Sequence, residues 1–325
     1  MESKLNRCLY CYKELDENQV DFHPKCSKKI FNTLIPPILS LSKKELHEMA
    51  EEITKRSITI PGVQPKLSLN LEALPDDPKK SRLTIVGLWG QYILKPQSEV
   101  YPSIPENEDL TMHLAQLAGI ETAQHTLLRT ETNQLVYVTK RFDRDNGKKV
   151  PMEDFCQLME VSSVGRSKYD NGTMEKVGKT IKKYSSAPGI DLIKFFDIAV
   201  FSFITGNADM HLKNFSIIKN DENQYRLSPA YDLMSSTLVM GKADPEQMAL
   251  HMNGKKNKIR RKDFIELAKK IEITPVAAEK IMMKYASLIS EFQDFISKSF
   301  LNDELKKQYI QILKDRSRAL EIHDK

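Results

Sequence analysis

Short runs in which apolar and polar residues alternate occupy the chain from about Ile58 to Lys140. β-Branched and aromatic residues are common in these runs, and such alternation predicts strands with one buried face. One helix interrupts them, because Leu110, Leu114 and Leu117 recur at helical spacing between Pro105 and Gly119. The predicted strands are Leu67-Ser68-Leu69, Leu83-Thr84-Ile85-Val86, Tyr92-Ile93-Leu94 and Leu135-Val136-Tyr137-Val138.

Helical patterns flank this strand-rich region. A capping box at Ser42-Lys43-Lys44-Glu45 predicts a helix to about Lys55. After Glu153 helical spacing dominates, most clearly in Leu192 to Thr205 and Lys262 to His323, with one short strand expected at Phe215 to Ile218. The pattern therefore predicts an α+β protein, in which a sheet-rich lobe precedes an all-helical lobe.

Two loops of the helical half carry acidic and amide side chains at a spacing that is typical of kinases. Asp209 follows a predicted helix, Asn214 comes five residues later, and Asp232 follows a short strand. In phosphoryl-transfer kinases an aspartate accepts the proton of the attacking hydroxyl, while an asparagine and a second aspartate bind Mg²⁺ through hard oxygen ligands. His211 or Lys213 could steady the transferring phosphate. The second aspartate favours this interpretation over a chance pair of loop residues and predicts an ATP- and Mg²⁺-dependent enzyme.

The strand-rich half supplies a matching lysine. Lys95 ends the strand Tyr92 to Lys95, where a kinase places the residue that contacts the nucleotide phosphates. Glu108, near the start of the next helix, is its expected ion-pair partner, and Glu106 is the alternative. Upstream, Pro61-Gly62-Val63-Gln64-Pro65-Lys66 could cover the phosphates with backbone amides, but its single glycine is equally compatible with a hairpin turn.

These positions predict a two-lobe protein-kinase-like fold. We expect an N-lobe over residues 37–142 and a helical C-lobe over residues 143–325. The first 36 residues form a separate small segment, because Cys8-x2-Cys11 and His23-x2-Cys26 have a spacing that can surround one tetrahedral zinc ion. Four protein ligands leave no open coordination position, so such a Zn²⁺ site would be structural. Unligated thiols are the alternative.

Composition adds few constraints. The chain has 325 residues and a formal net charge of +5, which is too small to argue for nucleic-acid binding. Six of the eight residues from Lys255 to Lys262 are basic, and this stretch is either a solvated loop or a contact for DNA phosphates. The first residues contain no apolar leader and no later stretch is long and apolar, so a cytoplasmic protein without membrane contact is expected.

Six segments in one order resemble the motifs of the HipA family of bacterial toxin kinases. They are Ser57 to Lys66, Tyr92 to Pro96, Lys140 to Arg144, Glu153 to Gln157, Asp209 to Asn214, and Pro229 to Asp232. The resemblance extends from about residue 55 to residue 290. It implies a serine/threonine protein kinase toxin of a toxin–antitoxin system, which phosphorylates an aminoacyl-tRNA synthetase with ATP and Mg²⁺ and slows growth.

The same resemblance implies roles for individual residues. Asp209 would be the catalytic base, Asn214 and Asp232 the magnesium ligands, and Lys95 an ATP contact. Backbone groups of Lys140 and Phe142 would contact the adenine. The remaining nucleotide-binding residues would be Arg141, His211, Lys213 and Tyr231, with Pro61 to Lys66 as the phosphate loop.

Members of the family also silence themselves by phosphorylating a serine three residues before the loop glycine. In this chain Thr59 stands at that position and Ser57 two residues earlier, so either hydroxyl could be the site of autophosphorylation. The pair resembles the Ser-x-Ser of the short HipT branch. In that branch a small HipS-like protein is similar to an amino-terminal subdomain of full-length HipA toxins. A HipB-like DNA-binding antitoxin is the other partner that the resemblance implies.

Two further function classes stay open. A small-molecule phosphotransferase could use the same Lys95, Asp209, Asn214 and Asp232, because this chemistry does not name the acceptor. A nucleic-acid-binding regulatory pseudokinase is disfavoured, since all the catalytic positions are filled.

Overall fold

The computed structural model describes residues 6–39, 66–86, 89–98, 100–145, 147–162, 166–241 and 246–322. The predicted helix after Ser42, the loop residues Pro61 to Pro65, and both Ser57 and Thr59 lie outside these ranges. The chain divides into two compact units. The first comprises Met1–Asp109, Ala123–Lys148 and Lys298–Phe300, and the second comprises Leu110–Thr122, Lys149–Ser297 and Leu301–Lys325.

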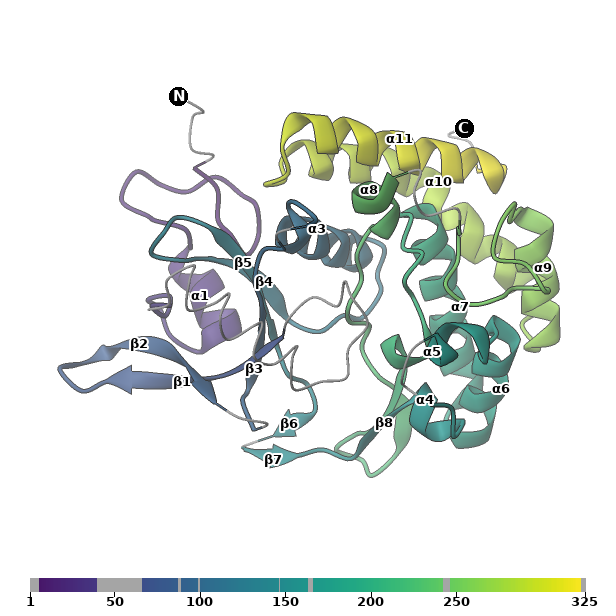
Figure 1. Ribbon diagram of the computed structural model, residues 1–325, viewed down its shortest axis with the longest axis horizontal. Coiled ribbons are helices and arrows are strands. Elements are labelled where there is room, and N and C mark those ends of the chain that lie inside the picture. The colour runs from purple at the N-terminus through teal and green to yellow at the C-terminus, as the bar shows by residue number, and fades with distance from the viewer. Residues whose placement is uncertain are drawn as a thin grey trace. The chain divides into compact units, whose positions relative to one another are not determined.

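A five-stranded antiparallel sheet organises the first unit (Figure 1). Its strands are β1 (Leu67–Leu74), β2 (Asp77–Val86), β3 (Tyr92–Lys95), β4 (His125–Arg129) and β5 (Leu135–Lys140), in the order β2-β1-β3-β5-β4. Alternation places Leu67 and Leu69 in the core and leaves Ser68 partly exposed, as the pattern predicts. β4 lacks this alternation and is not predicted, because the residues from His125 to Leu128 are all buried.

The amino-terminal segment packs against this sheet. Helix α1 (Pro24–Phe31) brings Phe31 within 5.8 Å of the Tyr92 ring, and the Tyr92 hydroxyl donates a 3.0 Å hydrogen bond to the Ile30 carbonyl. Along the edge strand β4, the Leu9 carbonyl accepts from the Leu127 amide at 3.3 Å and from the Thr126 hydroxyl at 3.2 Å. The segment and the sheet therefore share one hydrophobic core.

Helix α3 (Ile104–Leu117) follows β3 in the chain, close to its predicted limits. Two residues after its end, Gly119 adopts a left-handed φ of 75°. The Gly119 amide donates to Gln116 and the Ile120 amide to Ala115, so the last carbonyls of the helix are satisfied. Four consecutive polar residues in its first half, Glu106, Asn107, Glu108 and Asp109, are buried.

The second unit is mainly helical (Figure 1). Helix α7 (Pro188–Ile204) is buried along most of its length and contacts α6, α10 and α11. None of the described helices is both long and apolar enough to span a membrane. The other helical elements are α4 (Phe155–Leu158), α5 (Ser167–Asp170), α6 (Met174–Tyr184), η1 (Leu212–Asn214), α8 (Ser236–Met240), α9 (Arg261–Lys270), α10 (Pro275–Ser297) and α11 (Asp303–Ala319).

The prediction of an all-helical second lobe is wrong in one respect. A three-stranded antiparallel sheet, in the order β10-β9-β8, joins β8 (Met152–Asp154), β9 (Ser216–Lys219) and β10 (Tyr225–Leu227). Of these, only β9 is predicted. Strands of three or four residues are too short to establish a period. β9 and β10 are neighbours in the chain, whereas β8 pairs with β9 across a distant part of the sequence. A further pair, β6 (Arg144–Asp145) and β7 (Lys148–Lys149), forms a short ribbon.

Candidate active site and metal centre

The end of α7 positions Asp209. After Ile204 the chain turns at Gly206, which has a φ of 71° and no room for a side chain, since an added Cβ would lie 2.9 Å from Ile312 Cγ2. The next residues are fixed by hydrogen bonds. The Ala208 amide donates to Ser236 Oγ at 2.8 Å, and the Asp209 amide donates to Asn207 Oδ1 at 3.2 Å. Asp209 is thereby held partly exposed in a well-defined loop.

Asn214 is tied to the same loop. Its Nδ2 donates to the Asp209 carbonyl at 3.1 Å, and its backbone amide donates to the His211 carbonyl at 2.9 Å. Because the amide nitrogen is engaged, Oδ1 is the side-chain atom of Asn214 that can serve as a metal ligand. The structure therefore brings Asp209 and Asn214 together as the D-x4-N spacing predicts.

The segment after β10 carries Tyr231 and Asp232. The Tyr231 hydroxyl donates to the Lys213 carbonyl at 2.8 Å and lies 2.6 Å from Ser216 Oγ, which links this segment to η1 and β9. Asp232 is partly buried and has a left-handed φ of 55°. Such a conformation is uncommon for residues other than glycine and often marks functional sites.

His211 lies in the field of both carboxylates. Burial lowers the pKa of His211 to about 4, although the negative charges of Asp209 and Asp232 act in the opposite direction. The imidazole is therefore neutral at pH 7 and cannot contribute a positive charge to a phosphate. Lys213, by contrast, is exposed.

Tyr169 is a site residue that the sequence reasoning missed. Its hydroxyl donates a 2.6 Å hydrogen bond to Asp209 Oδ1, and its ring meets the His211 ring edge-on at 4.9 Å. Tyr169 belongs to α5, 40 residues before Asp209. No local motif marks it, so only folding reveals its contact with the predicted base.

The motif Glu153 to Gln157 contacts the chain next to the loop that carries Asp209 and Asn214. Asp154 caps α4 by accepting from the Gln157 amide at 3.0 Å, while the Gln157 side chain accepts from the Asp154 amide. This reciprocal capping box fixes Phe155, whose amide donates to the Phe215 carbonyl at 3.1 Å. The residues of this motif thus fix the backbone next to Asn214.

In the first unit, Lys95 and Glu108 form a buried ion pair. Lys95 Nζ lies 2.6 Å from Glu108 Oε1, and the two side chains are 5% and 2% exposed. Glu106, the alternative partner, instead accepts hydrogen bonds from Gln97 Nε2 at 3.0 and 2.9 Å. Burial raises the pKa of Glu106, although the hydrogen bonds from Gln97 act in the opposite direction.

The segment Lys140 to Arg144 is stabilised by charge pairing. Asp143 accepts two hydrogen bonds from Arg141, at 2.8 and 2.7 Å, and one of 2.6 Å from Arg144. Burial opposes ionisation of Asp143, but the bonds from Arg141 and the two positive charges lower its pKa below the usual value. The Lys140 amide donates to the Gln124 carbonyl at 2.8 Å, so in this structure that N–H is already engaged within the first unit.

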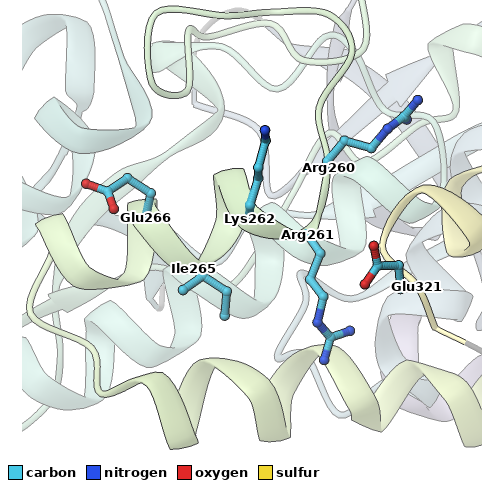
Figure 2. A pocket seen from close by; sticks show the side chains of 6 residues that line it. All are labelled: Arg260, Arg261, Lys262, Ile265, Glu266 and Glu321. Carbon is cyan, nitrogen blue, oxygen red and sulfur yellow. The ribbon is translucent and has the colours of Figure 1, made fainter.

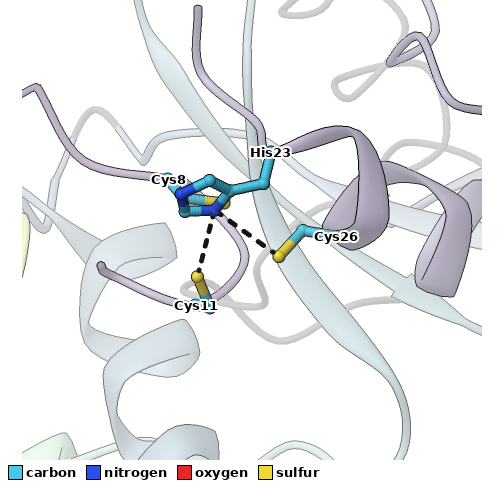
Figure 3. Close-up of side chains that lie close together, drawn as sticks. All are labelled: Cys8, Cys11, His23 and Cys26. Atoms are coloured by element: carbon cyan, nitrogen blue, oxygen red, sulfur yellow. Dashed lines mark hydrogen bonds between the residues drawn. The ribbon is translucent and has the colours of Figure 1, made fainter. Parts of the chain in front are cut away.

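The four predicted zinc ligands converge (Figure 3). Cys8 and Cys11 lie on one tight turn, His23 precedes α1, and Cys26 lies in its first turn. Their ligand atoms are all within 4.8 Å of one another. His23 Nδ1 is 3.5 Å from Cys11 Sγ and 3.7 Å from Cys26 Sγ. Three thiols and one imidazole are ligands that zinc prefers, and a group of four fits its tetrahedral coordination.

The surroundings prepare these residues for a cation. His23 Nε2 lies 2.9 Å from the Glu14 carbonyl, which makes Nε2 the protonated nitrogen and leaves the Nδ1 lone pair directed at the thiols. A hydrogen bond from Cys11 lowers the pKa of Cys8 to about 4 against the effect of burial. The same hydrogen bond, followed by burial, raises the pKa of Cys11. A lowered pKa favours the thiolate, which is the form of cysteine that binds metal.

The basic stretch from Lys255 to Lys262 is partly neutralised. Lys255 pairs with Asp263 at 2.7 Å, Lys256 with Glu246 at 3.4 Å, and Arg261 with Glu279. An open cavity of about 670 Å³ adjoins the start of α9 (Figure 2). None of the predicted catalytic or nucleotide-binding residues lines this cavity. Lys66 is the one residue of the predicted phosphate loop that the structure describes, and it is exposed just before β1.

Comparisons with known proteins add a family. The HipA-like C-terminal domain model matches residues 58–292. A putative kinase of Sinorhizobium fredii is 32% identical over 229 residues, which cover 66% of this chain and 54% of the relative. The serine/threonine-protein kinase toxin HipA of Shewanella oneidensis is 27% identical over 207 residues, which cover 56% of this chain and 44% of the toxin. The chain thus spans about half the length of these relatives.

Two solved structures share the fold. HipA in the Shewanella oneidensis complex of HipA, HipB and operator DNA matches with a TM-score of 0.65 and 19% identity, over 83% of this chain and 70% of that one. The Helicobacter pylori proinflammatory kinase CtkA matches with a TM-score of 0.54 and 16% identity, over 80% of this chain and 98% of that one. These matches confirm the predicted kinase-like α+β fold. With a family match over well more than half of its length, the chain belongs to the HipA-like C-terminal domain family.

Proposed function

We propose that this chain is an ATP- and Mg²⁺-dependent serine/threonine protein kinase that acts as the toxin of a toxin–antitoxin system. The observation that carries the proposal is the loop that holds Asp209 and Asn214 together through the 3.1 Å bond from Asn214 Nδ2. Family membership and the kinase names of the relatives support it. A base and a magnesium ligand on one rigid loop are what phosphoryl transfer requires.

Each site residue has a part in this reaction. Asp209 accepts the proton of the attacking hydroxyl, while Tyr169 donates to Oδ1 and holds the carboxylate in one orientation. Asn214 Oδ1 and the Asp232 carboxylate would hold Mg²⁺, which neutralises phosphate charge when it is bound. Lys95, kept in place by Glu108, contacts the nucleotide phosphates. His211 is neutral and donates or accepts a hydrogen bond without adding charge.

The nucleotide and regulatory roles extend to residues beyond this loop. Arg141, Phe142, Lys213 and Tyr231 would complete the nucleotide site, and Pro61 to Lys66 would cover the phosphates. Autophosphorylation of Ser57 or Thr59 would silence the enzyme. An aminoacyl-tRNA synthetase is the proposed substrate. A HipB-like antitoxin is the proposed partner, supported by the HipB-bound relative, and a HipS-like protein a second one.

We also propose that Cys8, Cys11, His23 and Cys26 hold one structural Zn²⁺. Their convergence within 4.8 Å and the second hydrogen bond of His23 support this assignment. A closed set of four ligands would brace the turn and α1 without taking part in the reaction.

Replacing the base tests the proposal. Asp209→Asn should abolish incorporation of labelled phosphate from ATP, because the amide cannot accept the hydroxyl proton. The matched control is Asp221→Asn, the same change at an exposed turn of the same unit, which should incorporate phosphate like the wild type. Mass spectrometry of the labelled wild type should locate the phosphate on Ser57 or Thr59. Equal incorporation by wild type and Asp209→Asn would refute the kinase assignment, and growth arrest by the Asp209→Asn chain would refute the toxin role.

A further inference from the structure

The Cys/His segment contacts the helix that carries Glu108. Tyr12, the residue after Cys11, is 1% exposed, and its hydroxyl donates a 2.8 Å hydrogen bond to Asp109 Oδ2. The other carboxylate oxygen, Oδ1, lies 2.7 Å from His125 Nδ1 on β4. Both Asp109 and His125 have fully buried side chains. A segment 97 residues away in sequence therefore supplies one of the hydrogen bonds of a buried carboxylate in α3.

Asp109 is the immediate neighbour of Glu108. Successive residues of an α-helix are rotated by about 100°, so the two carboxylates leave α3 in different directions. Glu108 meets Lys95 on β3 at 2.6 Å, while Asp109 meets Tyr12 and His125. The first half of α3 is thus fixed by buried polar contacts on two sides, and a shift of the helix that strains one contact strains the other.

Tyr12 is itself held by the turn that carries the first two metal ligands. It adopts a left-handed φ of 61°, and its amide donates to the Cys8 carbonyl at 2.9 Å. Its ring packs edge-on against Phe300 at 4.9 Å. The position of the Tyr12 hydroxyl therefore depends on the geometry of the Cys8-x2-Cys11 turn, which a bound cation would lock.

We propose that Tyr12 is a positioning residue for the Lys95–Glu108 ion pair. It acts through Asp109, and the Cys/His centre holds it in place, so occupancy of that centre by zinc sets the affinity of the kinase site for nucleotide. The inference rests on the proposed function, in which Lys95 contacts the phosphates. It assigns the amino-terminal segment a task in the reaction, namely to fix α3 in the orientation that pairs Glu108 with Lys95.

The physical reason is the cost of a buried carboxylate that loses a donor. Tyr12→Phe keeps the ring and its packing against Phe300 but removes the hydroxyl. Asp109 would then lose a hydrogen bond in a site without access to water, and the turn of α3 that holds Glu108 would shift to recover one. The expected consequence is a weaker hold on Lys95 and on the phosphates that it contacts.

The test measures binding of a fluorescent ATP analogue with Mg²⁺ to the zinc-loaded full chain. Tyr12→Phe should weaken binding about tenfold. Tyr225→Phe, the same change at an exposed tyrosine outside this turn, should bind like the wild type. Chelation of zinc from the wild type should weaken binding to a similar extent. If Tyr12→Phe does not fold, as judged by circular dichroism, Asp109→Asn serves as the second variant with the same expected loss.

A double-variant comparison separates positioning from general destabilisation. In a Glu108→Gln background, where the ion pair is already lost, Tyr12→Phe should weaken nucleotide binding no further. Additive losses, or Tyr12→Phe and Asp109→Asn variants that bind as tightly as the wild type, would overturn this inference alone. A wild-type chain that binds no nucleotide would instead overturn the proposed function, and this inference with it.

Discussion

At the scale of single residues, the environment of Asp209 decides what its carboxylate can do. One oxygen accepts from Tyr169, the carbonyl accepts from Asn214, and the amide donates to Asn207. These contacts fix both the backbone and the side chain before any substrate arrives, and such preorganisation is a large part of enzymatic rate enhancement. The neutral state of His211 leaves Lys213 as the positively charged side chain of this loop.

Tyr169→Phe tests this view of the base. A hydrogen bond to a charged group contributes about 1.5–3 kcal/mol. Because each 1.36 kcal/mol corresponds to a tenfold change in rate, loss of the hydroxyl should slow phosphoryl transfer by about ten- to a hundredfold. The KM for ATP should stay unchanged, because phenylalanine keeps the ring that packs against the predicted nucleotide residue His211 and only the hydrogen bond to Asp209 is lost. Initial rates of phosphate incorporation provide the measurement, with the partly exposed Tyr184→Phe as control. A normal rate for Tyr169→Phe would show that Asp209 needs no such support.

At the scale of elements, the junction of α7, η1 and β9 builds the candidate active site. Helix α7 is anchored in the core, and Gly206 allows the chain to reverse toward Asp209 where a side chain would collide with Ile312 and Thr237. β9 then pairs with β8, in a register that places Ser216 opposite Asp154. The site is therefore carried by paired and packed elements at both ends of its loop.

Gly206→Ala should destabilise the protein by about 2 kcal/mol, because a left-handed conformation costs an L-residue roughly 1–2 kcal/mol and the added Cβ meets Ile312 Cγ2 at 2.9 Å. Gly189→Ala is the matched control. It lies in the first turn of α7, where an added Cβ meets nothing within 4 Å, so it should be neutral or slightly stabilising. Thermal unfolding of both variants provides the comparison, and equal midpoints would contradict the steric account.

At the scale of the whole molecule, the amino-terminal segment shares the core of the first unit. Leu9, Phe22 and Phe31 pack with residues of the sheet, and Leu9 also bonds to the edge strand β4. A strand edge covered in this way is protected from pairing with other chains. Loss of the segment would therefore expose apolar surface as well as a strand edge. The predicted chain divisions at residues 36 and 142 stay predictions.

Zinc analysis tests the metal centre within this unit. Purified protein should contain close to one equivalent of zinc, and Cys26→Ser should lose it, whereas the matched change Cys156→Ser, outside the cluster, should retain it. A structural zinc contributes several kcal/mol to the free energy of unfolding, and each kcal/mol corresponds to about 2–4 °C in the unfolding midpoint. Removal of zinc by a chelator should therefore lower the midpoint by about 10 °C. Wild-type protein with less than about half an equivalent would favour unligated thiols.

Much of the fold follows from local patterns. Alternation over Leu67 to Leu69 and helical spacing over Leu110 to Leu117 reflect burial of one face, which any fold of this chain must satisfy. Local patterns do not predict β4, β8 and β10, for two reasons. β4 is buried on both faces, and the others are too short to show a period. β8 also pairs with β9, which is distant in sequence, whereas β4 and β10 pair with strands that are their neighbours in the chain.

The residues of the candidate sites also fall into those that the sequence predicts and those that only the tertiary structure reveals. The sequence alone indicated Asp209, Asn214, Asp232 and the four Cys/His ligands, because hydroxyl activation and metal coordination require particular atoms at nearly fixed spacings. Tertiary structure decided which acid pairs with Lys95, that His211 is neutral, and that Tyr169 and Tyr12 reach Asp209 and Asp109. These outcomes depend on burial and on contacts over 13 to 97 residues of chain, and neither is encoded in local spacing.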